Sequence, residues 1–162
     1  MEIMIVGGGI GGLTAALCLH RIGVRVTVFE SSHEFRELGV GINILPHAVK
    51  ILQELGVEEQ LLESGVELER YMWFNRFGQT IWSEPRGRNA GYKWPQISIH
   101  RGRLQAVLMA AVRERLGEEA LLGNHHLVDF KQQDDRVTAN FIDRRTGRPV
   151  GSYQADALIG AD

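Results

Sequence analysis

The stretch that decides the fold is Ile3-Met4-Ile5-Val6-Gly7-Gly8-Gly9-Ile10-Gly11-Gly12-Leu13, where an apolar run leads directly into a G-x-G-x-x-G turn. Gly7 allows a sharp turn off a strand, Gly9 allows the backbone to approach a pyrophosphate, and Gly12 allows a helix to pack closely on that strand. The free N–H groups at the helix start favour anionic phosphates. The stretch therefore predicts a dinucleotide cradle whose contacts are Gly7, Gly9, Ile10, Gly11 and Gly12.

The flanking sequence decides between a nucleotide site and an ordinary glycine-rich turn, because the motif alone occurs in many loops. Residues 2–6 predict a strand, residues 13–22 a buried helix, and residues 24–29 a second, β-branched strand. Glu30 ends that strand, 18 residues after the last glycine of the motif. A carboxylate there accepts hydrogen bonds from the adenosine ribose and repels a 2′-phosphate, which makes NADP a poor candidate for this site.

The composition describes a soluble globular chain of 162 residues, of which 44% are hydrophobic and 23% charged. A net charge of −2 and scattered basic residues disfavour a nucleic-acid-binding function. The single cysteine, Cys18, cannot form an intrachain disulfide and fits a reducing cytoplasm. Residues 3–20 carry no charge, but their five glycines and the lack of a preceding basic segment disfavour a membrane span or signal peptide.

A long connection, residues 31–43, follows Glu30, and long loops inside compact domains are usually functional. Its Gly39-Val40-Gly41 backbone is suited to lie against a flat ring. Arg36 can reach a pyrophosphate or a ribose, or it is a solvated surface arginine, and the residues alone leave both interpretations open.

The rest of the chain predicts mostly scaffold. Residues 46–55 and a segment that ends at Leu116 show helical spacing. Arg101 and Gln105, at the start of the second helix, are one turn apart and can point toward the same bound group. Strands are expected at residues 66–74, 80–82 and 97–100, and as several short strands between residues 121 and 162.

Aromatic residues gather around the first two of these strands. They form either a wall for a flat substrate or a set of half-buried strand side chains. The residues concerned are Tyr71, Trp73, Phe74, Phe77, Trp82, Tyr92 and Trp94.

A metal site is disfavoured. His125 and His126 are adjacent, but neighbours in a strand point to opposite faces, and no Cys or His partner has ligand spacing. The absence of a C-x-x-C motif also argues against the flavin disulfide reductases.

Five segments together resemble the FAD-dependent single-component aromatic-ring monooxygenases, the class of the para-hydroxybenzoate and salicylate hydroxylases. These segments are residues 7–12, Glu30, residues 38–43, residues 100–105 and residues 159–162. Within the class, residues 82–87 and 98–102 are most similar to phenazine hydroxylases.

The resemblance implies an α/β fold: a Rossmann-like FAD-binding βαβ unit with a parallel sheet, a β-meander crossover, and part of a second, mostly antiparallel substrate-side sheet. Residues 1–162 would form one FAD-binding domain, in which residues 66–98 begin the substrate-side sheet. FAD would lie extended, with its pyrophosphate over the glycine turn and its adenine at Leu127. The other residues that the resemblance places near FAD are Glu30, Ser31, Arg36, Val40, Gly41, Arg101, Gln105 and Asp162.

The activity that the resemblance implies is hydroxylation of an aromatic or phenazine-like substrate. In that class NAD(P)H reduces the flavin, O2 adds at its C4a position, and the resulting hydroperoxide delivers oxygen to the ring. Because the cofactor carries this chemistry, the sequence predicts no catalytic side chain and no metal.

Such enzymes are more than twice as long as this chain, which stops within Gly160-Ala161-Asp162. We therefore expect the N-terminal portion of a longer cytoplasmic enzyme, inactive alone and prone to self-association through uncovered apolar surface. Two alternatives stay open: another FAD- or NAD-linked oxidoreductase, and a dinucleotide-binding module without turnover.

Overall fold

The computed structural model describes residues 1–33 and 40–162, and Arg36 and Gly39 lie outside the described residues. The chain forms two compact units. Unit 1 comprises Met1–Arg36 and Leu108–Asp162, and unit 2 comprises Glu37–Val107.

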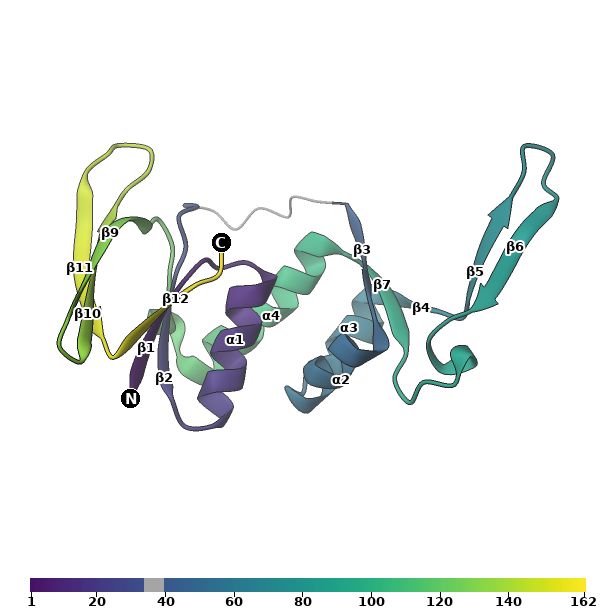
Figure 1. The fold of residues 1–162 in the computed structure, drawn as a ribbon, viewed down its shortest axis with the longest axis horizontal. Helices are drawn as coiled ribbons and strands as arrows, with labels where there is room; N and C mark the ends of the chain where they lie inside the picture. Colours follow the sequence, from purple (N-terminus) through teal and green to yellow (C-terminus); the bar gives the residue numbers. More distant parts are fainter. Residues whose placement is uncertain (34–39) are drawn as a thin grey trace. The chain divides into compact units, whose positions relative to one another are not determined.

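Unit 1 is built on a four-stranded parallel sheet with the order β12-β1-β2-β8, seen edge-on near β12 in Figure 1. Its strands are β1 (Glu2–Val6), β2 (Arg25–Phe29), β8 (Leu121–Leu122) and β12 (Ala157–Gly160). Strand β1 lies in the interior of the sheet, and its middle residues are buried on both faces, as its apolar run requires. The parallel sheet predicted from the sequence is confirmed.

Helix α1 (Ile10–Arg21) joins β1 to β2 and completes the βαβ unit. It begins at Ile10, three residues before the predicted start, because the turn glycines themselves take helical conformation. The helix ends where Gly23 adopts a φ of +80°, the left-handed conformation that terminates many helices. Its buried face contains Leu13, Ala16 and Leu17.

A three-stranded antiparallel meander with the order β11-β10-β9 packs on unit 1's sheet. Its strands are β9 (His126–Gln133), β10 (Arg136–Ile142) and β11 (Pro149–Ala155). Phe29 of the sheet stacks on Phe141 of β10, with ring centroids 4.3 Å apart. Met4, Ala139 and Ala155 are buried in the same core. The predicted meander is confirmed.

Unit 2 contains a three-stranded antiparallel sheet with the order β3-β7-β4 and a separate two-stranded hairpin, β5-β6. The strands are β3 (Gly41–Ile44), β4 (Gly65–Leu68), β5 (Arg70–Phe74), β6 (Thr80–Pro85) and β7 (Gln96–His100). The helices are α2 (Pro46–Glu54), α3 (Glu58–Ser64) and the 3₁₀ turn η1 (Gly87–Ala90). Helix α4 (Arg101–Leu116) follows β7, and the short η2 (Glu118–Ala120) precedes β8.

The structure differs from the sequence prediction in four elements of unit 2. Strand β3 begins at Gly41, within the predicted connection of residues 31–43, because this segment pairs with β7. Helix α3 was not predicted, because its seven residues carry only one buried apolar side chain, Leu61. The single strand predicted over residues 66–74 is two strands in different sheets, separated at Glu69. The carbonyl of Glu69 accepts a hydrogen bond from the Arg86 N–H at 2.9 Å, which fastens the chain where it changes sheets. Strand β6 continues to Pro85, three residues beyond the predicted end.

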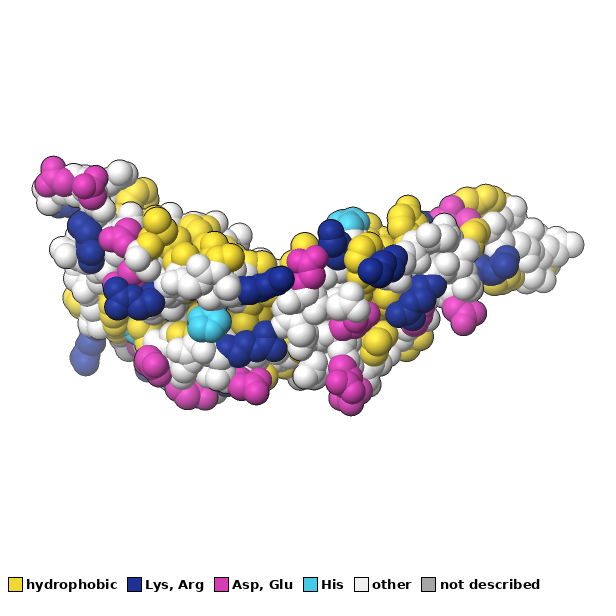
Figure 2. Space-filling view, turned by 90° about the horizontal axis from the view of Figure 1, so that it is seen from below, with side chains coloured by type: hydrophobic (Ala, Val, Ile, Leu, Met, Phe, Trp, Pro, Cys, Tyr) yellow, Lys and Arg dark blue, Asp and Glu magenta, His cyan; other side chains and the backbone are white. Residues whose placement is uncertain are grey.

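Among the aromatic residues of the β5-β6 hairpin, those of the strands are about half-buried and only Phe77 in the turn is largely exposed. Trp73 and Trp82 pair across the hairpin and each is 46% exposed, and Phe77 in the turn is 72% exposed. Hydrophobic side chains reach the surface over both units, among charged ones (Figure 2). None of the helices in residues 1–33 and 40–162 is long and apolar enough to cross a membrane.

Candidate nucleotide site

Four of the five glycines of the turn, Gly7, Gly9, Gly11 and Gly12, separate into two kinds. A Cβ atom on Gly7, whose φ is +120°, would lie 2.4 Å from the Ala161 carbonyl oxygen, and one on Gly12 would lie 1.9 Å from the Gly7 carbonyl oxygen. Side chains at these two positions are therefore excluded by the backbone. A Cβ atom on Gly9 or Gly11 would meet no atom within 4 Å. The second pair leaves open space beside the turn, as a cradle for a pyrophosphate requires.

The amino end of α1 is available to an anion. Gly9 is the N-cap residue, makes no side-chain hydrogen bond to the helix, and is followed by a first turn without acidic residues. Backbone N–H groups at such an end lack intrahelical acceptors, and the helix dipole adds positive potential there. These features fit the pyrophosphate of a dinucleotide.

Glu30 is fixed across this turn by hydrogen bonds to both of its carboxylate oxygens. The Gly8 N–H donates to Oε2 at 2.8 Å. The Ser32 N–H donates to Oε1 at 2.7 Å, and the Ser31 hydroxyl donates to the same oxygen at 3.1 Å. These bonds tie the end of β2 to the glycine turn and hold the carboxylate in one orientation.

The surroundings of Glu30 also set its charge. Burial raises the pKa of Glu30, but the hydrogen bonds from the Ser32 and Gly8 N–H groups and from the serine hydroxyls outweigh burial, so the pKa lies below its usual 4.5. Glu30 is therefore ionised at neutral pH and accepts hydrogen bonds. This is the state that a ribose-binding carboxylate needs.

A segment that the sequence did not indicate, residues 122–125, lies against the end of β2. The Glu30 N–H donates to the Leu122 carbonyl at 2.8 Å, the His125 N–H donates to the Glu30 carbonyl at 2.8 Å, and the Asn124 N–H donates to the Ser32 carbonyl at 3.1 Å. Asn124 has a φ of +61°, the left-handed conformation that is common in turns. The Gly-Asn dipeptide at 123–124 was therefore the sequence signal that could have predicted a turn here.

Leu127 follows this segment in β9 and packs, partly buried, against the core that contains Phe29. The His125 ring lies in the neighbouring aromatic cluster, where its two nitrogens lie 2.7 Å from the Gly123 carbonyl and 3.0 Å from the Tyr153 hydroxyl. Within the described ranges no group of three or more His, Cys, Asp or Glu side chains could hold a metal ion.

Asp162 lies beside the glycine turn. The Ala161 N–H donates to the Val6 carbonyl at 2.7 Å, and the Asp162 nitrogen lies 2.8 Å from the position that a Gly7 Cβ would take. Unit 1 thus brings together the glycine turn, Glu30, Ser31, Leu127 and Asp162.

Four other predicted site residues, Val40, Gly41, Arg101 and Gln105, lie in unit 2, whereas Arg36 lies outside the described residues. The Arg101 N–H donates to the Val40 carbonyl at 3.2 Å, and Gly41 pairs with His100 across β3 and β7. Arg101 and Gln105 occupy the first turns of α4. A feature that the sequence did not indicate is the His100 ring, whose Nδ1 accepts a hydrogen bond from the Gly102 N–H at 3.2 Å at the start of this helix.

A parallel βαβ unit with an open glycine turn and a fixed acidic residue defines a dinucleotide-binding protein. The chain belongs to the FAD binding domain family, whose model matches residues 1–162. Its cofactor is FAD.

The chain is similar to curated enzymes over nearly its whole length. It is 44% identical to phenazine 1,6-dicarboxylic acid hydroxylase PhzS of Lysobacter antibioticus, over 99% of this chain and 40% of that protein. It is 34% identical to 3-hydroxybenzoate 6-hydroxylase 1 of Aquipseudomonas alcaligenes, again over 99% of this chain and 40% of that protein. The chain therefore spans about 40% of the length of these relatives.

Solved structures show the same fold. The flavin-dependent monooxygenase PieE, solved with FAD and substrate, is 26% identical and superposes with a TM-score of 0.84, over 100% of this chain and 30% of that one. The p-nitrophenol 4-monooxygenase PnpA of Pseudomonas putida, at 23% identity, shares the fold with a TM-score of 0.86, over 100% of this chain and 42% of that one.

Proposed function

We propose that this chain is the FAD-binding portion of a flavoprotein monooxygenase that hydroxylates an aromatic, phenazine-like substrate with NAD(P)H and O2. The observation that carries the proposal is the Glu30 carboxylate, ionised and fixed by the Gly8 N–H beside an uncapped helix start. Support for the reaction class comes from the relatives, which are named as hydroxylases of phenazine and hydroxybenzoate substrates.

The residues of unit 1 would bind and orient the adenosine and pyrophosphate portions of FAD. The glycine turn, with Gly9, Ile10 and Gly11, would hold the pyrophosphate, and Glu30 would accept hydrogen bonds from the ribose. Ser31 would support Glu30, because its hydroxyl already donates to that carboxylate. The backbone near Leu127 would contact the adenine, and Asp162 would lie beside the pyrophosphate.

The residues of unit 2 would hold the rest of the cofactor. Arg101 and Gln105 would contact the phosphate and ribityl groups, and Val40 and Gly41 would lie against the ring. Val40 is 77% exposed and a Cβ on Gly41 would meet no atom, so both are open to a ligand. Arg36 is proposed for the same role from the sequence, although it lies outside the described residues. When bound, FAD supplies the redox chemistry, and the side chains need only bind, orient and exclude water.

Two further parts of the proposal concern the surroundings of the protein. The free thiol of Cys18, partly buried in α1, fits a reducing cytoplasm. Self-association is proposed from the exposed aromatic side chains of the β5-β6 hairpin, and light scattering of the purified chain tests it.

The proposal is tested by calorimetric titration of the 162-residue chain with FAD and, separately, with NAD, followed by an absorbance spectrum after desalting. We expect FAD to bind and to leave a flavin spectrum on the protein. Binding of NAD without binding of FAD would contradict the monooxygenase assignment. Oxidation of NADH in the presence of bound FAD would separate an enzyme from a binding module.

A further inference from the structure

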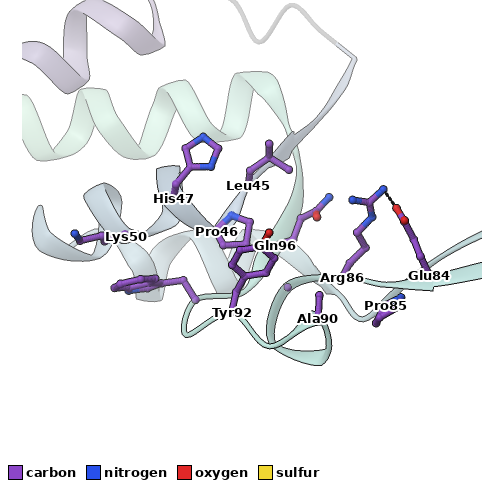
Figure 3. Close-up of a pocket in the computed structure, with 12 residues that line it drawn as sticks. Leu45, Pro46, His47, Lys50, Glu84, Pro85, Arg86, Ala90, Tyr92 and Gln96 are labelled. Atoms are coloured by element: carbon purple, nitrogen blue, oxygen red, sulfur yellow. Dashed lines mark ion pairs between the residues drawn. The ribbon is translucent and has the colours of Figure 1, made fainter.

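A pocket of about 480 Å³ lies within unit 2 beside the start of α2 (Figure 3). Its Arg86 and Lys50 side chains are already paired with the carboxylates of Glu84 and Glu54, so both cations are neutralised within the protein. The polar contacts beside the glycine turn of unit 1 differ, because they lead from a surface turn of the meander to the carboxylate proposed for ribose binding.

The turn between β10 and β11, residues 143–148, is organised around Asp143. Its Oδ1 atom accepts hydrogen bonds from the Arg145 N–H at 2.7 Å and from the Thr146 N–H at 2.9 Å. The backbone closes the same turn, since the Asp143 N–H donates to the Arg148 carbonyl at 2.8 Å. One carboxylate oxygen is thus used within the turn, and the other contacts a distant part of the chain.

The second oxygen of Asp143 holds Asn124. The Asn124 side-chain N–H donates to Asp143 Oδ2 at 2.9 Å. The Asn124 amide and the Thr146 N–H are the main groups that lower the pKa of Asp143 to about 2. Asp143 is therefore ionised at neutral pH, and a hydrogen bond to a charged acceptor is stronger than one between neutral groups.

Asn124 in turn holds the end of β2. Its backbone N–H donates to the Ser32 carbonyl at 3.1 Å, and the His125 N–H donates to the Glu30 carbonyl at 2.8 Å. The Ser32 N–H donates to Glu30 Oε1 at 2.7 Å. A continuous series of hydrogen bonds therefore runs from Asp143 through Asn124 to the Glu30 carboxylate.

The backbone conformation of Asn124 depends on this support. Its φ of +61° lies in the left-handed region, which residues other than glycine adopt uncommonly, although asparagine tolerates it better than most. The side-chain bond to Asp143 stabilises this conformation. It thereby fixes the direction in which the Asn124 backbone N–H points toward Ser32.

We propose that Asn124 and Asp143 are positioning residues for the cofactor, which hold the Glu30 carboxylate in the orientation that meets the adenosine ribose of FAD. They act through the backbone of residues 30–32 and not by touching FAD themselves. The inference rests on the proposed function, because that function supplies the ribose contact of Glu30.

Calorimetric titration of the 162-residue chain with FAD tests the proposal in the variant Asn124→Gly. Glycine adopts the left-handed conformation readily, so this substitution removes the amide and permits the same backbone conformation. We expect the affinity for FAD to fall roughly fivefold, the effect of losing one hydrogen bond. Unchanged affinity in the folded variant would overturn the proposal.

Reversal of the pair separates positioning from a general loss of stability. Asn124→Asp places two carboxylates against each other and should weaken FAD binding roughly tenfold. Adding Asp143→Asn restores a donor opposite an acceptor with the original net charge, and the affinity should return to within about twofold of that of the unsubstituted chain. A folded double variant that stays as weak as Asn124→Asp would contradict the proposal.

Asn140→Asp is the matched control. The Asn140 side-chain N–H donates to Asp129 Oδ1 at 2.5 Å, so this substitution also sets two carboxylates against each other in the meander. Because that pair joins β10 to β9 and not to residues 30–32, we expect urea unfolding to show a loss of stability and FAD titration to show no change. An equal loss of FAD affinity in Asn140→Asp would reduce Asn124 to a structural role and overturn the proposal.

The pKa of Glu30 provides a readout that needs no FAD. Burial raises this pKa, but the hydrogen bonds from the Ser32 and Gly8 N–H groups outweigh burial, so the pKa lies below 4.5. In Asn124→Gly, NMR titration of the Glu30 carboxyl should show a pKa closer to 4.5, because the segment that carries the Ser32 N–H is released. An unchanged pKa would overturn the proposal. If the chain binds no FAD but this pKa rises, the proposed function fails and Asn124 still positions Glu30.

Discussion

At the scale of single residues, Glu30 has the most consequential environment in the chain. Its carboxylate receives hydrogen bonds from two backbone N–H groups, those of Gly8 and Ser32, and from the Ser31 hydroxyl. One side chain therefore both fastens the glycine turn to β2 and presents the negative charge proposed for ribose binding. Stability and cofactor affinity are coupled at this position.

Glu30→Gln should weaken FAD binding roughly tenfold, because hydrogen bonds to a charged acceptor are stronger than those to a neutral amide. Calorimetric titration measures the change. Glu63→Gln, on the exposed surface of α3, is the matched control and should bind FAD as the unsubstituted chain does. Equal affinity of the Glu30→Gln variant would argue against a ribose contact.

The depressed pKa of Glu30 predicts a pH dependence of stability. Because the pKa is lower in the folded state, Glu30 stabilises the fold above its usual pKa of 4.5, and this contribution is lost as the pH falls from there through the folded-state pKa. Urea unfolding between pH 6 and about 3 should therefore show a shallower acid loss in Glu30→Gln than in the unsubstituted chain. Asp143, whose pKa is lowered to about 2 by the Asn124 amide and nearby backbone N–H groups, contributes equally to both proteins.

At the scale of elements, the turn between β1 and α1 assigns different tasks to similar glycines. Gly7 and Gly12 permit backbone contacts that no side chain could allow, and Gly9 and Gly11 face open space. The motif thus combines a folding requirement with a binding requirement in six residues.

This division predicts that the same substitution, glycine to alanine, lowers stability at one position and weakens FAD binding at another. Gly12→Ala should reduce the free energy of unfolding by about 3 kcal/mol, because its Cβ collides with a backbone oxygen that cannot move aside. Gly9→Ala should leave the free energy of unfolding nearly unchanged but weaken FAD binding roughly tenfold, since its Cβ would enter the space that we propose for the pyrophosphate. Urea denaturation and FAD titration of both variants check this, and a Gly9→Ala variant that unfolds easily would contradict it.

At the scale of the whole molecule, unit 1 depends on a core shared by two sheets. Phe29 comes from the parallel sheet and Phe141 from the meander, and both are about 1% exposed. Because the facing sides of the parallel sheet and of the meander are buried against each other, the meander belongs to the same folded unit.

Phe141→Ala should reduce the free energy of unfolding by about 3–5 kcal/mol, since it removes a buried ring and leaves a cavity. The exposed Phe77 provides a matched control, and Phe77→Ala should change the free energy by less than about 0.5 kcal/mol. Urea denaturation followed by far-UV circular dichroism measures both. Comparable effects of the two substitutions would contradict the core described above.

The sequence by itself determined the β1-turn-α1-β2 unit and the acidic residue at its end, and both lie where predicted except that α1 begins three residues earlier. These features depend on residues close together in the chain, where apolar periodicity and glycine chemistry act locally. The helix over Pro46–Glu54 follows from the same kind of signal, with a proline at its first position.

Only the tertiary structure decided which distant segments meet. Strand β12 pairs with β1 in the register Ile3↔Ala157, and residues 122–125 lie against Glu30, although neither contact has a local sequence signal. The local sequence also does not predict the division of residues 66–74 between two sheets or the burial of Gln96. Such pairings are selected by the burial of whole apolar faces against one another. The free energy of this burial comes from residues that are far apart in the chain.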